Sequence, residues 1–333
     1  MMGFALGRRS RRRALCTLAF AAAAILGQPA LARPADKVTY LLPAPREAIV
    51  LAPFLLAEQE GRYRRGKLDV RFVMVPGGFN VGEALARGEG DLGGASGDTP
   101  ILLRAADLPV KGIALLGRHS FLTLVTRHDS FETSGSFEGK AIDVPSLKDT
   151  SYYAVQKMAE GSPGSSLRIS TQARPPAELI AALGSRRIDG FIGTVDWGVK
   201  AEREGVRLDY RELDAIYPAM AQAIMASETT IAAKPKVLRR FVRATLQVIR
   251  QIARDPEGAA MRYEAAVPSS GYSHAEIVRI FGLLATHVYG DLKLLGRFNE
   301  ATVCSAEGEL LERKLVIRRR SASDYFTNSI VGR

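Results

Sequence analysis

A short run of small and polar residues stands directly before a proline in this chain: Ser96, Gly97, Asp98 and Thr99. Pro100 suits the first position of a helix, so we predict that Thr99 is the N-cap of a helix that starts here. The residues before the run, 92–95, are small and apolar, which is typical of a buried strand. A turn between a buried strand and a helix N-terminus can offer N–H groups and hydroxyls to a small ligand. We therefore predict that these four residues bind a ligand.

Three further stretches have a similar composition and also precede predicted helices. They are Gly77, Gly78 and Asn80; Thr150 and Ser151; and Thr194. Binding of an anion at a helix N-terminus needs free N–H groups, small side chains and hydroxyls, and these stretches supply them. Ordinary helix capping explains each residue as well when it is taken alone. A shared ligand role requires a fold that brings the four stretches to one cleft.

Four residues with charged or aromatic side chains could add specificity to such a cleft: Arg46, Asp98, Asp196 and Trp197. Either aspartate could pair with an amine of a zwitterionic ligand, although an acid that stabilises the positive end of a helix is the more common role. Trp197 is the only tryptophan, and it could stack on a ligand or lie in a core. Arg46 follows the first predicted strand and could hold an anionic group through two hydrogen bonds, although an exposed arginine is the commoner outcome.

Patterns typical of enzymes and metal centres are missing from the sequence. The four histidines, His119, His128, His274 and His287, do not have the spacing of a histidine pair with an acid that binds metal. There is no Gly-x-Ser-x-Gly turn and no phosphate-binding loop of the Gly-x4-Gly-Lys type. We therefore predict a protein that is not an enzyme, with no catalytic residue, no cofactor and no metal.

The N-terminal region has the pattern of an export signal. Five arginines within residues 8–13 precede an uncharged run over residues 14–27, and a small-residue cleavage motif ends at Ala32. This pattern predicts a signal peptide over residues 1–32, cleaved after about Ala32, and a mature chain in the periplasm that does not span the membrane. Residues 10–15 also approximate the twin-arginine pattern, with Ala14 in place of the usual Phe, so folded and unfolded export both stay open.

The charge of the mature chain excludes one class of partner. Cleavage removes five arginines from a chain of formal charge +11, which leaves +6. No stretch combines lysines and arginines with exposed aromatic residues, so we predict no nucleic-acid partner. Cys16 is removed with the signal peptide, and Cys304 then has no partner for an intrachain disulfide.

Strands alternate with helices along most of the chain, which predicts an α/β fold with parallel sheets and helices on both faces. The pattern runs from residue 37 to 121 and then restarts as a second α/β unit. A strand over 219–226 leads back toward the first unit. The last third is helical, and its stretch 236–254 has one apolar face.

Several stretches, taken in order, resemble one family. They are APFLLAEQEGRYRRGKLDVRFVMVPGG, EALARGEGDLGGASGDTPILLRAADLPVKGIALLG, FEGKAIDVPS, DWGVKAEREGVRLDY and KPKVLRRFVRATLQVIRQIARDPEGAA. They are similar to the periplasmic solute-binding proteins of ABC importers, in the branch that takes up sulfonates, taurine, nitrate and thiamine-pyrimidine precursors. The turn GDTP looks most like that of the sulfonate-binding members. The chain departs from the family pattern at 146–149 and 196–198, so the resemblance does not carry over the identity of the ligand.

The resemblance implies a type II periplasmic binding protein fold, in which two lobes close on a ligand through a hinge of two crossovers. Lobe 1 is expected over residues 33–121 and 224–333, and lobe 2 over residues 122–223. The expected partners are a small anionic or zwitterionic solute, with a sulfonate favoured, and an ABC permease with its ATPase. A monomer is expected. Two alternatives stay open, namely an exported ligand sensor of the same fold and an enzyme such as a pyrimidine-precursor synthase.

Overall fold

The structure, a computed structural model, describes residues 1, 34–131, 137–147, 149–160, 168–169 and 173–332. Its contacts divide the chain into two compact units, Met1–Ala35 and Asp36–Arg333, and the second is described below. The predicted signal peptide and its cleavage site lie outside the described residues, apart from Met1. None of the helices in the described ranges is both long and apolar enough to cross a membrane.

The first sheet has five strands in the order β2-β1-β3-β10-β4. These strands span Leu68–Met74, Asp36–Leu42, Leu92–Ser96, Gln222–Ser227 and Val110–Leu115. β1 runs parallel to β2 and β3, whereas β10 is antiparallel to both of its neighbours, β3 and β4. The mostly parallel α/β sheet predicted from the sequence is therefore confirmed, with one reversed strand inserted beside the last.

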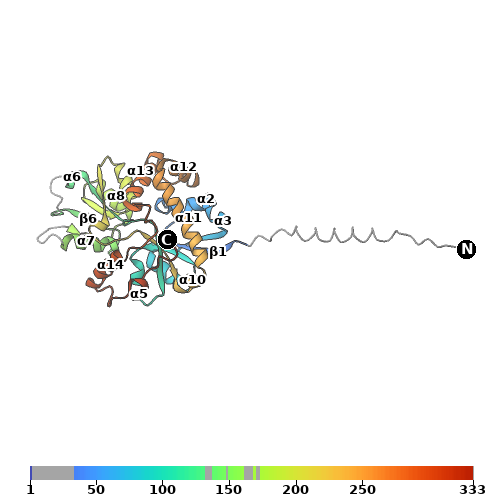
Figure 1. Cartoon of the computed structure of the whole chain (residues 1–333). Helices are drawn as coiled ribbons and strands as arrows, with labels where there is room; N and C mark the ends of the chain where they lie inside the picture. The colour runs from blue at the N-terminus through green and yellow to red at the C-terminus, as the bar shows by residue number, and fades with distance from the viewer. Residues whose placement is uncertain (2–33, 132–136, 148, 161–167, 170–172, 333) are drawn as a thin grey trace. The chain divides into compact units, whose positions relative to one another are not determined.

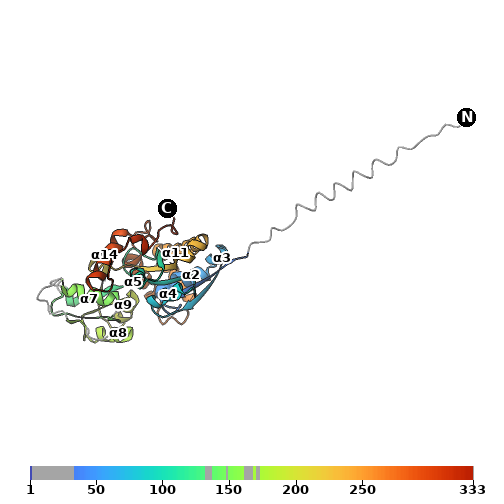
Figure 2. The same cartoon turned by 90° about the horizontal axis from the view of Figure 1, so that it is seen from below.

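Helices cover both faces of this sheet. One face packs against α2 (Ala52–Gln59), α3 (Arg62–Arg65) and α11 (Pro235–Arg254), which lie together in Figures 1 and 2. The other face packs against α4 (Gly78–Ala86), α5 (Thr99–Ala105) and α14 (Glu300–Glu312). Successive residues of β1 point to opposite faces, so that Tyr40 belongs to the first core and Leu41 to the second. The short helix α10 (Glu228–Ala233) follows β10.

The second sheet repeats this arrangement with the order β7-β6-β8-β5-β9. Its strands span Arg168–Ile169, Ala141–Asp143, Gly190–Gly193, Thr123–Arg127 and Leu208–Glu212. Here β5 is the reversed strand, antiparallel to β8 and β9. The core on one face includes α7 (Thr150–Glu160), and the core on the other includes α8 (Pro176–Gly184) and α9 (Val195–Glu202). The helical turn α6 (His128–Phe131) follows β5.

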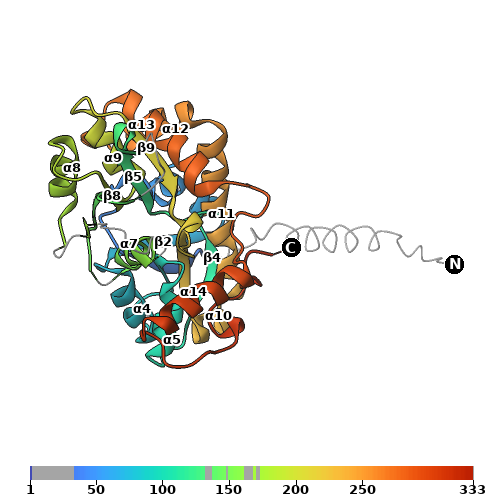
Figure 3. The same ribbon diagram turned by 90° about the vertical axis from the view of Figure 1, so that its left-hand side faces the viewer.

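The chain passes between the two sheets twice, through residues 116–122 after β4 and through residues 213–221 after β9. The division into lobes at residues 121 and 223 stays a prediction. The remaining helices are α12 (Pro256–Ala266) and α13 (His274–Leu284), the 3-10 turns η1 (Ile49–Leu51), η2 (Leu213–Ala215) and η4 (Ala322–Asp324), and the π-helical turn η3 (Ala285–Tyr289). Figure 3 shows β5, β8 and β9 near α9 and α13, and β2, β4, α4 and α14 lower in the view.

Two helix starts differ from the prediction by one or two residues. Asp98, rather than Thr99, is the N-cap of α5, and the side chain of Asp98 does not cap the helix. Helix α4 already begins at Gly78, so Asn80 does not start a capping box and instead donates to the Pro76 carbonyl at 2.8 Å. A capping box between Ser273 and Glu276 begins α13.

Candidate functional site

A cavity of about 610 Å³ lies where the carboxyl ends of strands from both sheets meet. From the first sheet it is lined by the turn after β1, the start of α4 and the turn from β3 into α5. From the second sheet it is lined by the loop after β6, the start of α7 and the start of α9. The end of α13 and the turn η3 supply a further wall. The lining therefore joins segments that are far apart in the sequence.

Nine of the residues predicted to bind a ligand line this cavity. They are Gly77, Gly78, Asn80, Ser96, Asp98, Thr99, Thr150, Thr194 and Trp197. The structure thus brings all four predicted helix starts to one place. Their contact with a ligand stays a prediction.

Four predicted residues, Arg46, Gly97, Ser151 and Asp196, are not among the lining residues. The guanidinium of Arg46 pairs with Glu58 and lies 5.7 Å from the ring of Phe72, so its charge is already paired. Gly97 packs against the second crossover, where a Cβ would approach the Cβ of Met220 to 2.6 Å.

The hydroxyl and the carboxylate in this group also have partners within the protein. Ser151 is fully buried and its hydroxyl donates to Asp149. Asp196 is buried in the first turn of α9 and accepts a hydrogen bond from the Tyr272 hydroxyl at 3.1 Å. Burial raises the pKa of Asp196, and hydrogen bonds from Thr194 and Tyr272 oppose that rise. Asp196 therefore ties α9 to the segment before α13.

Asp98 and Thr150 join the two sides of the cavity. The Thr150 hydroxyl donates to the Asp98 carboxylate at 2.6 Å, and both residues are buried. Asp98 precedes α5 on the first sheet, whereas Thr150 begins α7 on the second. A hydrogen bond to a buried carboxylate contributes about 1.5–3 kcal/mol, which makes this contact a large single tie across the cavity.

The residues of charged type in the described lining are acidic. Asp98 and Asp149 both line the cavity, and the described lining residues include no lysine, arginine or histidine. Asp149 as a whole residue is exposed, but desolvation of its carboxyl group raises the pKa, hydrogen bonds from Ser151 oppose the rise, and the nearby charge of Asp98 adds to it. Burial and the charges of the same two aspartates also raise the pKa of the Tyr153 phenol.

Ser96 carries a polar group without a partner. Its hydroxyl oxygen is buried and makes no hydrogen bond to the rest of the described chain, although the residue lines the cavity. A buried hydroxyl without a partner is costly, and a ligand in the cavity would provide one.

Two glycines leave room for side chains that line the cavity, one aromatic (Trp197) and one polar (Gln222). A Cβ on Gly193 would lie 2.3 Å from the Trp197 ring, so the indole lies across the end of β8. A Cβ on Gly94 would lie 2.8 Å from the Gln222 amide nitrogen. The cavity can therefore present a flat aromatic surface and an amide beside its carboxylates.

Many residues that line the cavity were not among those predicted to bind a ligand. The missed residues include Phe79, Leu102, Phe121, Leu122, Asp149, Tyr153, Gln222, Leu284, Val288 and Tyr289. Most are apolar and belong to patterns that equally predict a buried core. Asp149 was adjacent to a predicted helix start, and its position there was the one available signal.

Comparisons with known proteins agree with this geometry. The NMT1/THI5 like family matches residues 48–259. The chain is similar in structure to the alkanesulfonate-binding protein SsuA of Xanthomonas axonopodis pv. citri, with 16% identity, a TM-score of 0.64, and 89% of this chain and 99% of that chain covered. No curated protein matches the chain in sequence.

Two other solved structures have the same fold. The periplasmic aliphatic sulphonate binding protein SsuA of Escherichia coli is 16% identical, with a TM-score of 0.61, and the match covers 88% of this chain and 92% of that one. The periplasmic nitrate-binding protein NrtA of Synechocystis PCC 6803 is 11% identical, with a TM-score of 0.67, and the match covers 89% of this chain and 87% of that one. The periplasmic binding protein fold predicted from the sequence is therefore confirmed.

Proposed function

We propose that this chain, which belongs to the NMT1/THI5-like family, is an exported binding protein that captures a small solute and delivers it to an ABC importer. The observation that carries the proposal is the convergence of polar residues from both sheets on one cavity of about 610 Å³. Cavities of this size suit small molecules. The similar structures named above are binding proteins for sulfonates and nitrate, which supports a transport role.

Closure of the two sides around the solute would produce the form that the importer recognises. The two crossovers, 116–122 and 213–221, are the segments that would bend. The hydrogen bond between Thr150 and Asp98 would hold the closed form. Ligand binding would then shift the population from open to closed because only the closed form offers both walls at once.

For the solute itself, we infer a molecule with a protonated amine, as in a zwitterion, rather than a simple anion. Asp98 and Asp149 lie in the lining, and no cation accompanies them in its described part. The prediction from sequence favoured a sulfonate, but Arg46 pairs with Glu58 instead of facing the cavity. An anionic group would have to depend on N–H groups at the starts of α4, α7 and α9, beside two carboxylates. An amine would pair with those carboxylates directly.

The test is a calorimetric titration of the mature protein with taurine, a zwitterion, and with ethanesulfonate and nitrate, which lack the amine. We expect saturable binding of an amine-bearing ligand, and recovery of that ligand unchanged. Asp98→Asn should weaken amine binding by about 10- to 100-fold, which corresponds to loss of a hydrogen bond to a charged group. Asp69→Asn, at an exposed position of β2, is the matched control and should bind as the wild type does.

Two results would count against these proposals in different ways. Binding of ethanesulfonate or nitrate, unaffected by Asp98→Asn, would overturn the amine assignment and keep the transport role. Lys148 precedes Asp149 and lies outside the described residues, so Lys148→Gln belongs in the same series and would identify a cation that serves such an anion. Chemical conversion of the ligand would instead favour an enzyme.

A further inference from the structure

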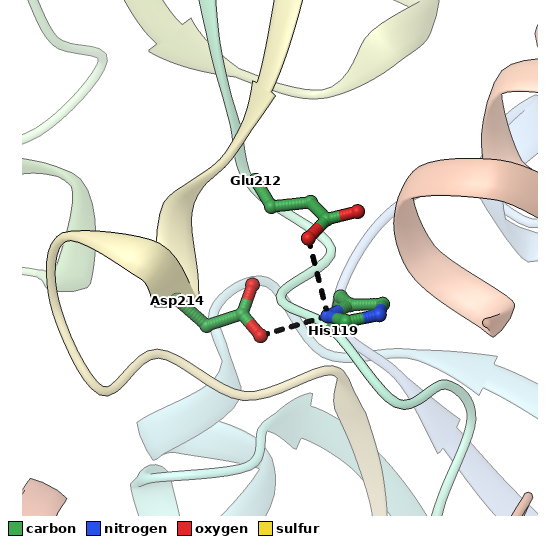
Figure 4. Close-up of side chains that lie close together, drawn as sticks. All are labelled: His119, Glu212 and Asp214. Atoms are coloured by element: carbon green, nitrogen blue, oxygen red, sulfur yellow. Dashed lines mark hydrogen bonds and ion pairs between the residues drawn. The ribbon is translucent and has the colours of Figure 1, made fainter. Parts of the chain in front are cut away.

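A second group of polar side chains lies outside the cavity, at the start of both crossovers. Figure 4 shows His119, Glu212 and Asp214 pointing toward one another. The Nδ1 atom of His119 lies 2.9 Å from Oδ2 of Asp214 and 3.6 Å from Oε2 of Glu212. One ligating atom from each of the three residues falls within 4.8 Å of the other two.

A fourth residue, His287 of η3, reaches the same group. Its Nδ1 atom lies 3.9 Å from Oε1 of Glu212. This nitrogen is buried and has no hydrogen-bond partner in the described chain, and the same is true of Oδ1 of Asp214.

From this group we infer a binding site for a divalent transition metal of the zinc class, with His119, Glu212 and Asp214 as ligands. Zinc binds imidazole nitrogen and carboxylate oxygen at 2.0–2.2 Å in a tetrahedron. The edges of such a tetrahedron are about 3.4 Å long. The distances from Nδ1 of His119 to the carboxylate oxygens of Asp214 and Glu212, 2.9 and 3.6 Å, lie on both sides of that value. Two carboxylates also balance the charge of the ion.

The backbone around the group explains why the histidine lies there. The N–H of His119 donates to the carbonyl of Val288 at 3.1 Å, which joins the first crossover to η3. Gly290 has a φ of 56°, and a Cβ at this position would lie 3.0 Å from the His119 ring. A glycine here therefore leaves room for the imidazole.

An ion pair between His119 and Asp214 is the simpler explanation, but it accounts for only part of the group. Such a pair needs one acid, and it leaves the approach of Glu212 unexplained. A metal ion would be bound by His119, Glu212 and Asp214 together. It would tie the two crossovers together at the segments expected to bend on closure.

The experiment is a titration of the mature, EDTA-treated protein with zinc chloride, followed by calorimetry and by thermal unfolding. We expect one zinc ion per chain and a saturable rise in the melting temperature. His119→Ala and Asp214→Asn should each weaken binding by more than the roughly 10- to 100-fold that loss of an outer-sphere partner costs. Cobalt(II) should bind in place of zinc and give the visible absorption of a tetrahedral site.

His274 provides a matched control. It lies 2.8 Å from both Glu264 and Glu257, so it forms another histidine group with two acids, at the start of α13. His274→Ala should leave zinc binding unchanged. The inference is overturned if the wild-type protein binds no zinc, or if His119→Ala and His274→Ala bind zinc as well as each other. Circular dichroism of each variant shows whether a loss of binding comes from misfolding.

Discussion

Substitution of Gly97 tests how tightly the turn from β3 into α5 is packed. A Cβ at this position would lie 2.6 Å from the Cβ of Met220, 2.9 Å from the carbonyl oxygen of Ala221 and 3.0 Å from Leu115. Gly97 is not among the glycines with positive φ, so alanine fits the backbone and the cost is steric alone. The Ala221 contact is with backbone, which cannot rotate away as a side chain can. Gly97→Ala must therefore move the turn that carries Ser96 and Asp98.

The expected size of the effect combines two opposing contributions. Overpacking of a buried position costs about 1–3 kcal/mol. Alanine also lowers the conformational entropy of the unfolded chain, which stabilises the folded state by about 0.4–1 kcal/mol. The midpoints of these ranges, about 2 and about 0.7 kcal/mol, give a fall in the free energy of unfolding of about 1.3 kcal/mol, measured from urea denaturation by circular dichroism.

Gly282 is the matched control for this substitution. It lies within α13, and a Cβ there would meet nothing within 4 Å. Gly282→Ala should raise the free energy of unfolding by about 0.4–1 kcal/mol because alanine favours the helix. The reasoning is refuted if Gly97→Ala is as stable as Gly282→Ala.

Three further predictions concern the helices beside the cavity and the single tryptophan. Arg203 lowers the pKa of Glu276 from 4.5 to about 2, so this charge stabilises the fold fully above pH 4.5. Glu276→Gln should lower the urea midpoint at pH 7, and its difference from the wild type should shrink as the pH falls toward 2. Asp255 caps α12 through the N–H of Gly258, so Asp255→Ala should lower the free energy of unfolding by about 1 kcal/mol in the same assay. Ligand binding should change Trp197 emission, and Trp197→Phe should abolish that signal while calorimetry still detects binding; a persistent signal would exclude this assignment.

The sequence was enough to predict the alternation of strands and helices, and with it the cavity at the ends of the strands. Gly77, Ser96, Thr150 and Thr194 were identifiable because each lies at or near the passage from a strand to a helix. The cap at α5 was misplaced by one residue because Asp98 and Thr99 are both typical N-caps. Local patterns of this kind depend on neighbouring residues, which the sequence shows directly.

The charge of the cavity could not be predicted in this way. Arg46 was a reasonable anion ligand until the fold placed Glu58 of α2 beside it. The wall formed by Val288 and Tyr289 comes from a turn far along the chain. For the same reason a search for closely spaced histidines could not find a group that combines His119 with Glu212. These contacts depend on the path of the crossovers, which no short pattern encodes.

The position of β10 has a consequence for how the chain folds. β10 lies between β3 and β4, although both of these strands precede it in the sequence. A growing chain that ends before Gln222 therefore carries two strand edges without a partner, and such edges can pair with other chains. The strands of the second sheet all lie between Thr123 and Glu212, so that sheet can form first. The first sheet is complete only after β10 has been synthesised. The pairing of β10 with β3 and β4 joins residues far apart in the sequence, and such pairing slows folding.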